Sequence, residues 1–86
     1  MKIVLSAHAR ERMRERGLKT KDIQLAILHP DRLEVDRTQR DRWMVKRVYR
    51  RNATGSRHLL MVIFELHEGV IEVITVISTS KIRKYL

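Results

Sequence analysis

Several features are scarce in this 86-residue chain. It has no cysteine, which excludes a disulfide framework and a thiolate metal site. Proline occurs once and glycine three times, and the glycines are too isolated to form a phosphate-binding loop. Aromatic residues make up 5% of the chain, and no apolar run is long enough to span a membrane. The sequence therefore predicts one small domain, residues 1–86, with a core of marginal size.

Signals for targeting and for bound metals are also missing. The apolar run at residues 3–5 is too short for a secretory signal, so we expect a cytoplasmic protein with no membrane contact. The four histidines have neither His-x-His nor His-x-x-x-His spacing, and the ten acidic residues are scattered. Because a metal site needs clustered ligands, the sequence predicts no metal and no other cofactor.

Positive charge is what the chain has in abundance. Nineteen Lys and Arg residues against ten Asp and Glu residues give a formal net charge of +9 and a sequence pI near 10.9. Such a balance favours a polyanionic partner, either nucleic acid or an acidic protein. Most of the cations are arginines, whose planar forks suit bidentate contact with phosphate.

A short basic helix is predicted between Ser6, which can cap it, and Gly17, which can end it in a left-handed conformation. His8, Arg12 and Arg16 follow one another at i, i+4 and i+8, so they share one stripe. An imidazole can transfer protons and guanidiniums can hold phosphate. The alternative is a solvated helix whose arginines form salt bridges with the interspersed glutamates.

The rest of the pattern predicts an α+β fold. Thr20 is a plausible cap for a second helix that ends before Pro30. Turn residues then separate segments with strand-like alternation, and loops this short require antiparallel pairing. The turn signals are the cluster Asn52–Ser56 and the pair Glu68-Gly69. The predicted strands are Lys2–Leu5, Arg32–Asp36, Arg42–Arg51, Arg57–Leu66 and Val70–Ser78.

These elements assemble into two N-terminal helices packed on a 3–4-stranded antiparallel sheet. The central strands are apolar on both faces, so each face of the sheet needs a cover. The helices can cover one face. Ile82, Tyr85 and Leu86 recur at helical spacing, so a short C-terminal helical turn can cover part of the other. A homodimer is an alternative cover for that face.

The composition leaves two kinds of chemistry open, metal-free cleavage of RNA and plain nucleic-acid binding. Cleavage without metal needs a base, an acid and cations that stabilise the phosphorane, and His, Lys, Arg and Tyr can fill these roles. The catalytic candidates are His8, Arg12, Lys81 and Tyr85. The candidates for nucleic-acid binding are Arg16, Arg42, Lys46, Arg47, Arg50, Arg51, Arg83 and Lys84.

Each candidate also has an ordinary structural explanation. His8 could simply bond to backbone or to an acidic neighbour, and Tyr85 could plug the core with its hydroxyl at the surface. The cations of the tail could complement the C-terminus of a helix. Trp43 and Tyr49 share a strand face and could stack on bases, although core packing is the commoner use of such residues.

Two motifs resemble a known family. Residues 8–18 read His-Ala-x-x-Arg-Met-x-x-Arg-Gly-Leu, and residues 74–85 read Ile-Thr-Val-Ile-x-Thr-Ser-Lys-Ile-x-Lys-Tyr. Together they resemble domain-of-unknown-function family 4258, which is grouped with the RelE-like toxins. The resemblance covers nearly the whole chain and implies a RelE-like fold, a cytoplasmic toxin–antitoxin setting and activity against RNA.

RelE-like toxins typically cut ribosome-bound messenger RNA without metal, using basic residues and often a C-terminal Tyr. By resemblance, the matching positions are the cations of the sheet together with Lys81, Lys84 and Tyr85. His8 departs from that class, which does not generally rely on a histidine in the first helix.

The first hypothesis is therefore a metal-independent endoribonuclease toxin that an acidic antitoxin neutralises. The second is a non-catalytic module that binds RNA or DNA through the same basic residues. The third is an interaction protein whose charge serves an acidic protein partner. A cleavage assay separates the first hypothesis from the second.

Overall fold

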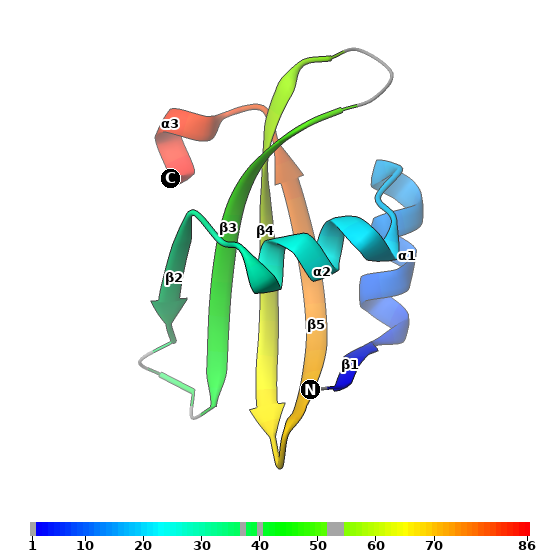
Figure 1. Cartoon of the computed structure of the whole chain (residues 1–86), viewed down its shortest axis with the longest axis vertical. Coiled ribbons are helices and arrows are strands. Elements are labelled where there is room, and N and C mark those ends of the chain that lie inside the picture. The colour runs from blue at the N-terminus through cyan, green and yellow to red at the C-terminus, as the bar shows by residue number, and fades with distance from the viewer. Residues whose placement is uncertain (1, 37, 40, 52–54) are drawn as a thin grey trace.

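A mixed β-sheet forms the centre of the protein (Figure 1). The computed structural model describes residues 2–36, 38–39, 41–51 and 55–86. Within these residues the sheet has five strands, in the order β1-β5-β4-β3-β2. The strands are β1 (Lys2–Leu5), β2 (Arg32–Val35), β3 (Arg42–Arg50), β4 (Arg57–His67) and β5 (Val70–Thr79).

The predicted sheet of 3–4 antiparallel strands is corrected in two respects. It has five strands, and β1 runs parallel to β5, with Lys2 opposite Val70. The hairpins β3–β4 and β4–β5 are antiparallel as predicted. The error has a physical reason, because the pairing of β1 joins segments from opposite ends of the chain and leaves no local turn signal.

The turn between β4 and β5 is tight, as the sequence predicted. Glu68 and Gly69 both have positive φ, at 49° and 78°, which matches the twist of the hairpin. The other predicted turn cluster includes residues 52–54, which lie outside the described residues.

Helix α1 (Ala7–Arg16) begins and ends where the sequence predicted. The Ser6 hydroxyl accepts a hydrogen bond from the Ala9 N–H at 3.0 Å and donates one to the Ile74 carbonyl at 2.9 Å. Gly17 ends the helix with φ of 65°, a conformation that strains residues with a Cβ. Ser6 thus caps the helix and also attaches it to β5.

Helix α2 (Thr20–Leu28) starts one residue earlier than predicted. Its N-cap is Lys19, whose backbone N–H donates to the Asp22 carboxylate at 2.8 Å. Thr20 is the first helical residue, and its hydroxyl does not cap the helix. The carboxylate three residues after the cap holds the backbone N–H here, so a threonine cap is not needed.

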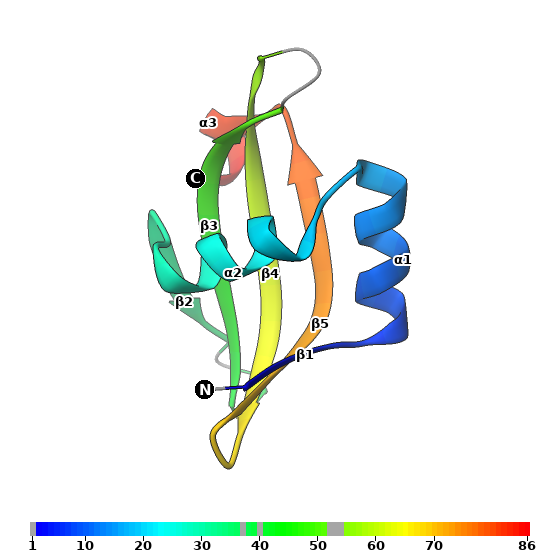
Figure 2. The same cartoon turned by 45° about the vertical axis from the view of Figure 1, so that its right-hand side comes forward.

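The core lies between α1 and α2 on one side and the sheet on the other (Figure 2). Ala9, Ile23 and Ala26 have no solvent exposure. They belong to a cluster that continues into the sheet through Val45, Leu60, Val62, Val73 and Val76. A register shift at Ile63 and Phe64 changes the alternation of β5, so that Val73 and Val76 both reach the core.

A short helix, α3 (Ile82–Tyr85), confirms the predicted C-terminal helical turn and lies on the opposite face of the sheet. Lys46, which alternates with the core residue Val45, donates from Nζ to the Tyr85 carbonyl. Arg32 donates to the Leu86 carbonyl. The sheet covers the apolar side chains of the tail only in part. Tyr85, for example, remains 39% exposed.

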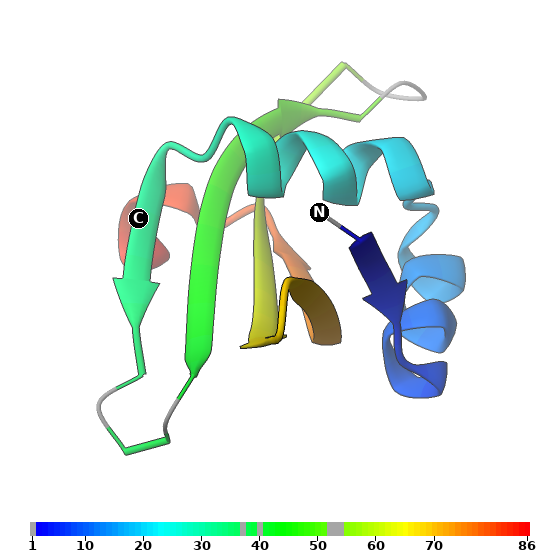
Figure 3. The same cartoon turned by 60° about the horizontal axis from the view of Figure 1, so that its bottom comes forward.

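An apolar groove of about 490 Å³ remains open beside α2, which crosses the sheet in the view of Figure 3. Leu28 and Leu33 on its rim are 66% and 55% exposed, respectively. We call it the apolar groove, and its lining includes Ile3, Ile27, Leu28, Leu33, Trp43 and Phe64.

Among the described residues, no helix is long and apolar enough to cross a membrane.

Candidate nucleic-acid interface

Two adjoining hollows of about 340 and 400 Å³ lie where α1 ends, α2 begins and β3 approaches its end. They share Asp22, Tyr49 and Arg50. We call them together the basic cleft, because their lining also contains five further cations: Arg16, Lys19, Arg47, Arg51 and Arg57.

Local structure explains why these cations converge. The left-handed turn at Gly17 ends α1 directly after Arg16 and returns the chain towards the sheet through Lys19. Along β3, Arg47 and Tyr49 alternate with the residues of the other face and so lie on the same side as the helices. Arg50, the last residue of the strand, has the opposite alternation but still lines both hollows at the strand end. Three elements therefore contribute charge to one hollow.

The cations of the basic cleft are not neutralised by carboxylates. Within the described part of the chain, none of them forms an ion pair with Asp or Glu. Arg47 donates to the His29 carbonyl at 2.6 Å, and Arg50 donates to the Gly55 carbonyl at 3.1 Å, but both acceptors are uncharged. The carboxylate of Asp22 accepts the backbone N–H of Lys19. The cleft therefore has an excess of positive charge.

Two of these arginines face one another across the hairpin. In the register of β3 and β4, Arg50 is the direct partner of Arg57. Like charges placed opposite each other destabilise a sheet. An anion between them would remove the repulsion, and guanidinium forks match the oxygens of a phosphate.

Tyr49 stands in the cleft with its ring half-buried against the core. Its hydroxyl lies 2.6 Å from Ser78 Oγ, and its ring centroid is 6.1 Å from that of His58. From the sequence, Tyr49 could either pack in the core or stack on bases. In the structure its ring packs against the core, and the residue also lines the cleft. His58 is not among the site residues predicted from the sequence, and its cross-strand pairing with Tyr49 places it next to the cleft.

His8 and Arg12 are exposed on α1, the helix that packs on β5. Arg12 lies 3.8 Å from Glu15, with both side chains about half exposed. A salt bridge of this kind between arginine and glutamate is what the alternative of a solvated helix predicts. Of the predicted stripe, only Arg16 lines the basic cleft, since it is the last residue of the helix.

Lys81 and Tyr85 lie on the other side of the sheet from His8 and Arg12, as the contacts of α3 with Lys46 and of α1 with β5 show. The four predicted catalytic residues therefore do not form one site. Lys81, Arg83 and Lys84 line a separate open hollow. Arg57 lines both that hollow and the basic cleft, so positive charge continues around this end of the protein.

Two predicted binding residues are engaged elsewhere. Lys46 is 7% exposed and lies 3.2 Å from Glu34, while Arg42 holds the Glu65 carboxylate at 2.6 Å. Both ion pairs form because the Lys46 and Arg42 side chains lie on the face of β3 opposite the helices. On that face they contact glutamates of the neighbouring strands β2 and β4. Neither belongs to the basic cleft.

Two ionisable groups near Arg42, the Glu65 carboxyl and the His67 imidazole, have shifted pKa values. The hydrogen bond from Arg42, and then the one with His67, lowers the pKa of Glu65. The hydrogen bond with Glu65 raises the pKa of His67 above its usual value. These shifts belong to a cluster at the end of the sheet away from the basic cleft.

Comparison with known proteins gives one match. The sequence model of a family described as "Domain of unknown function (DUF4258)" matches residues 5–83, which is nearly the whole chain. No curated protein and no solved structure matches the chain.

Proposed function

The chain belongs to domain-of-unknown-function family 4258, and we propose that it is an RNA-binding protein that acts as a metal-independent endoribonuclease toxin. The observation that carries the proposal is the basic cleft, where six cations surround Tyr49 without a carboxylate ion-pair partner among the described residues. The relationship to RelE-like toxins, and with it ribosome-bound messenger RNA as the substrate, is part of the proposal.

Single-stranded RNA is the polyanion that fits this surface best. Backbone phosphates satisfy the guanidiniums of Arg16, Arg50 and Arg51, while the exposed part of the Tyr49 ring offers a surface for a base. The continuation of charge through Arg57 towards Lys81 allows a strand to pass around the end of the sheet.

Cleavage would use the 2′-hydroxyl of the RNA itself. A base removes its proton, the 2′-oxygen attacks phosphorus, and the 5′-oxygen leaves with a proton from an acid, which yields a 2′,3′-cyclic phosphate. His8 with Arg12 is one candidate pair for proton transfer and charge stabilisation. Lys81 with Tyr85 is the other, and because the pairs lie on opposite faces only one of them acts on a given bond.

An acidic antitoxin is the proposed protein partner. The apolar groove exposes Leu28 and Leu33, and the chain carries a net charge of +9. An acidic amphipathic segment would cover the groove and neutralise nearby cations in one binding event. Like-charge repulsion makes a second copy of this chain the weaker candidate for the same groove.

The binding test uses a fluorescein-labelled single-stranded RNA and fluorescence anisotropy across a salt series. Affinity should fall by about 10²–10⁴-fold between 50 and 200 mM salt if several phosphates are contacted. The double variant Arg16→Ala/Arg51→Ala should bind more weakly and reduce the salt slope by about one for each residue. Arg10→Ala, on the same helix but outside the cleft, is the matched control.

The cleavage test uses the same RNA, free and ribosome-bound, in the presence of EDTA. Cleavage products ending in a 2′,3′-cyclic phosphate support the ribonuclease, and loss of activity in His8→Ala or in Tyr85→Phe identifies the acting pair. Binding without cleavage would favour the non-catalytic module. Absence of both, with tight binding of an acidic protein, would favour the interaction protein.

A further inference from the structure

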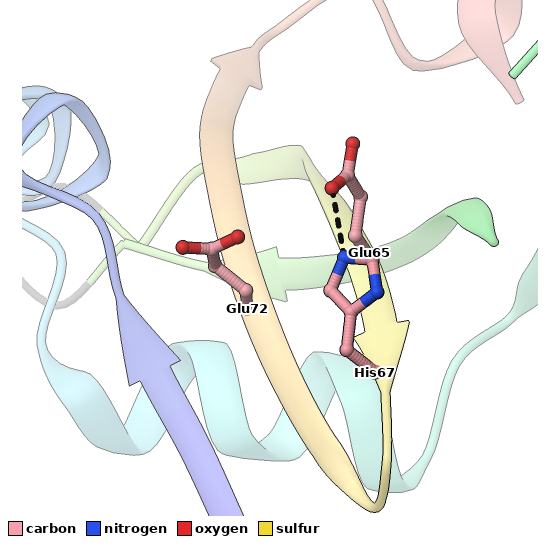
Figure 4. A group of neighbouring side chains, drawn as sticks. All are labelled: Glu65, His67 and Glu72. Atoms are coloured by element: carbon pink, nitrogen blue, oxygen red, sulfur yellow. Dashed lines mark hydrogen bonds and ion pairs between the residues drawn. The ribbon is translucent and has the colours of Figure 1, made fainter. Parts of the chain in front are cut away.

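A cluster of metal-ligand side chains lies at the end of the sheet away from the basic cleft (Figure 4). Glu65 and His67 are two residues apart on β4, so their side chains leave the same face of the strand. Glu72 is the direct partner of Glu65 on β5. One ligand atom from each of the three residues lies within 4.8 Å of the others.

The geometry already resembles two adjacent ligands of one ion. Glu65 Oε1 and His67 Nε2 are 3.0 Å apart and share a proton in a hydrogen bond. Two ligands with metal bonds of about 2.0–2.2 Å are separated by about 3.0 Å at a right angle and by about 3.4 Å at the tetrahedral angle that zinc prefers. A metal ion could replace the shared proton with little movement of either side chain.

Charge also favours a cation here. Glu65 and Glu72 are like charges in directly opposite positions, which destabilises a sheet unless something neutralises them. Arg42 engages Glu65 through Oε2, at 2.6 Å from one guanidinium nitrogen and 3.2 Å from Nε. That contact leaves Oε1 for another partner and fixes the carboxylate, as outer ligands do at metal centres. Within the described residues, the carboxylate of Glu72 has no hydrogen bond or ion pair.

We infer that Glu65, His67 and Glu72 bind a divalent transition-metal ion of the zinc type. Imidazole with carboxylates suits Zn²⁺ and its neighbours, whereas Mg²⁺ and Ca²⁺ prefer oxygen ligands alone. The ion joins β4 to β5 next to their turn, and three protein ligands leave coordination positions for water or for a group from a partner. The inference does not depend on RNA binding, because the cluster and the basic cleft share no residue.

Histidine spacing could not reveal this cluster. The ligands come from Glu-x-His on one strand and a glutamate beyond a two-residue turn, and they converge only in the hairpin register. The sequence-based prediction of no metal rested on histidine pairs and runs of acidic residues, neither of which is needed when a tight hairpin brings the ligands together.

The test uses the full chain, freed of metal with EDTA and desalted. Titration with Co²⁺ should produce visible d–d absorption that saturates at one ion per chain, and Zn²⁺ should displace the Co²⁺ and raise the melting temperature. His67→Ala and Glu72→Gln should each weaken Co²⁺ binding at least about tenfold. His29→Ala, which removes an exposed histidine from another part of the protein, should bind Co²⁺ like the original chain.

Three outcomes would overturn the inference. They are the absence of a saturable Co²⁺ signal, a signal that survives in both ligand variants, and Mg²⁺ binding as tight as that of Co²⁺. Glu72→Gln guards against unfolding as the cause of lost binding, because the Glu72 carboxylate forms no hydrogen bond or ion pair among the described residues. RNA affinity should be equal in all four proteins.

Discussion

The two ends of the β-sheet carry like-charged cross-strand pairs of opposite sign. At the basic cleft Arg50 faces Arg57, and near the β4–β5 turn Glu65 faces Glu72. Each pair costs stability in the isolated chain. We interpret each as the place where a counter-ion binds: an anion at the first end and a cation at the second.

The comparison also shows what decides the role of an arginine on β3. Arg42 and Arg50 lie on the same strand, but Arg42 is opposite Glu65 and Arg50 is opposite Arg57. The first forms an ion pair of 2.6 Å, and the second forms none among the described residues. The cross-strand partner, rather than the residue type, separates the structural arginine from the candidate binding residue.

The largest effect is expected from Arg50→Glu. If Arg50 binds phosphate as proposed, replacing it with an anion removes one contact and adds repulsion, so RNA affinity should fall by about 10²-fold at low salt. The same change converts a like-charge pair into an ion pair with Arg57, so the free energy of unfolding should rise by about 0.2–1 kcal/mol. Anisotropy and calorimetry measure the two effects, with Arg10→Glu as the control. Unchanged RNA affinity would remove Arg50 from the interface.

Tyr49 gives the next largest effect. Tyr49→Leu should weaken RNA binding by roughly 5- to 150-fold if the ring stacks on a base, which corresponds to about 1–3 kcal/mol. Tyr49→Phe keeps the ring but loses the contact with Ser78, so it should lower stability by about 0.5–1.5 kcal/mol and leave RNA affinity within about twofold. Equal RNA affinities for all three proteins would assign the ring to the core alone.

Arg42→Gln should produce the opposite pattern to Arg50→Glu. It removes the cation that holds Glu65, which leaves two opposed carboxylates without a guanidinium, so the melting temperature should fall. RNA affinity should stay within about twofold, because Arg42 does not line the cleft. A large loss of RNA binding in a folded Arg42→Gln protein would contradict the division between the two ends.

The smallest effect concerns the connection from β2 to β3. Two hydrogen bonds from Thr38 lower the pKa of Asp36 below its usual value of 3.8. The larger effect comes from the Thr38 hydroxyl and the smaller from its backbone N–H. A carboxyl group whose pKa is lower in the folded protein stabilises the fold at pH values above its pKa in the unfolded chain. This contribution is lost as the pH falls through the pKa of the folded state. Thr38→Ala should therefore slightly reduce stability at neutral pH and make no difference at pH 2. Chemical denaturation at the two pH values measures it.

What could be predicted from the sequence follows the range of the interactions. Ser6 and Gly17 set the ends of α1 through bonds within a few residues, so both ends were correct. The hairpins of β3, β4 and β5 also follow from local alternation and turns. The pairing of Lys2 with Val70 depends on contacts between distant segments, and no local pattern encodes it.

The candidate site divides in the same way. Arg16, Arg47, Arg50 and Arg51 could be named from the sequence because charge is visible there, and the structure brings them together in one cleft. No sequence pattern indicates that Lys81 and His8 occupy opposite faces, since this depends on how the sheet lies between α1 and α3. Nor could it reveal His58 or the Glu65–His67–Glu72 cluster, because both require the strand register.

The parallel pairing of β1 with β5 has a consequence for synthesis. Ribosomes add about 5–20 residues per second. Val70 is made 68 positions after Lys2, its partner, so β1 must wait roughly 3–14 s for the strand that completes it. Until then Ile3, Leu5, Ala9 and Met13 lack the strand surface that covers them in the finished fold. Before β5 is made, the nascent chain therefore exposes an apolar edge beside a basic helix, and the pairing of β1 becomes possible only after β5 is made.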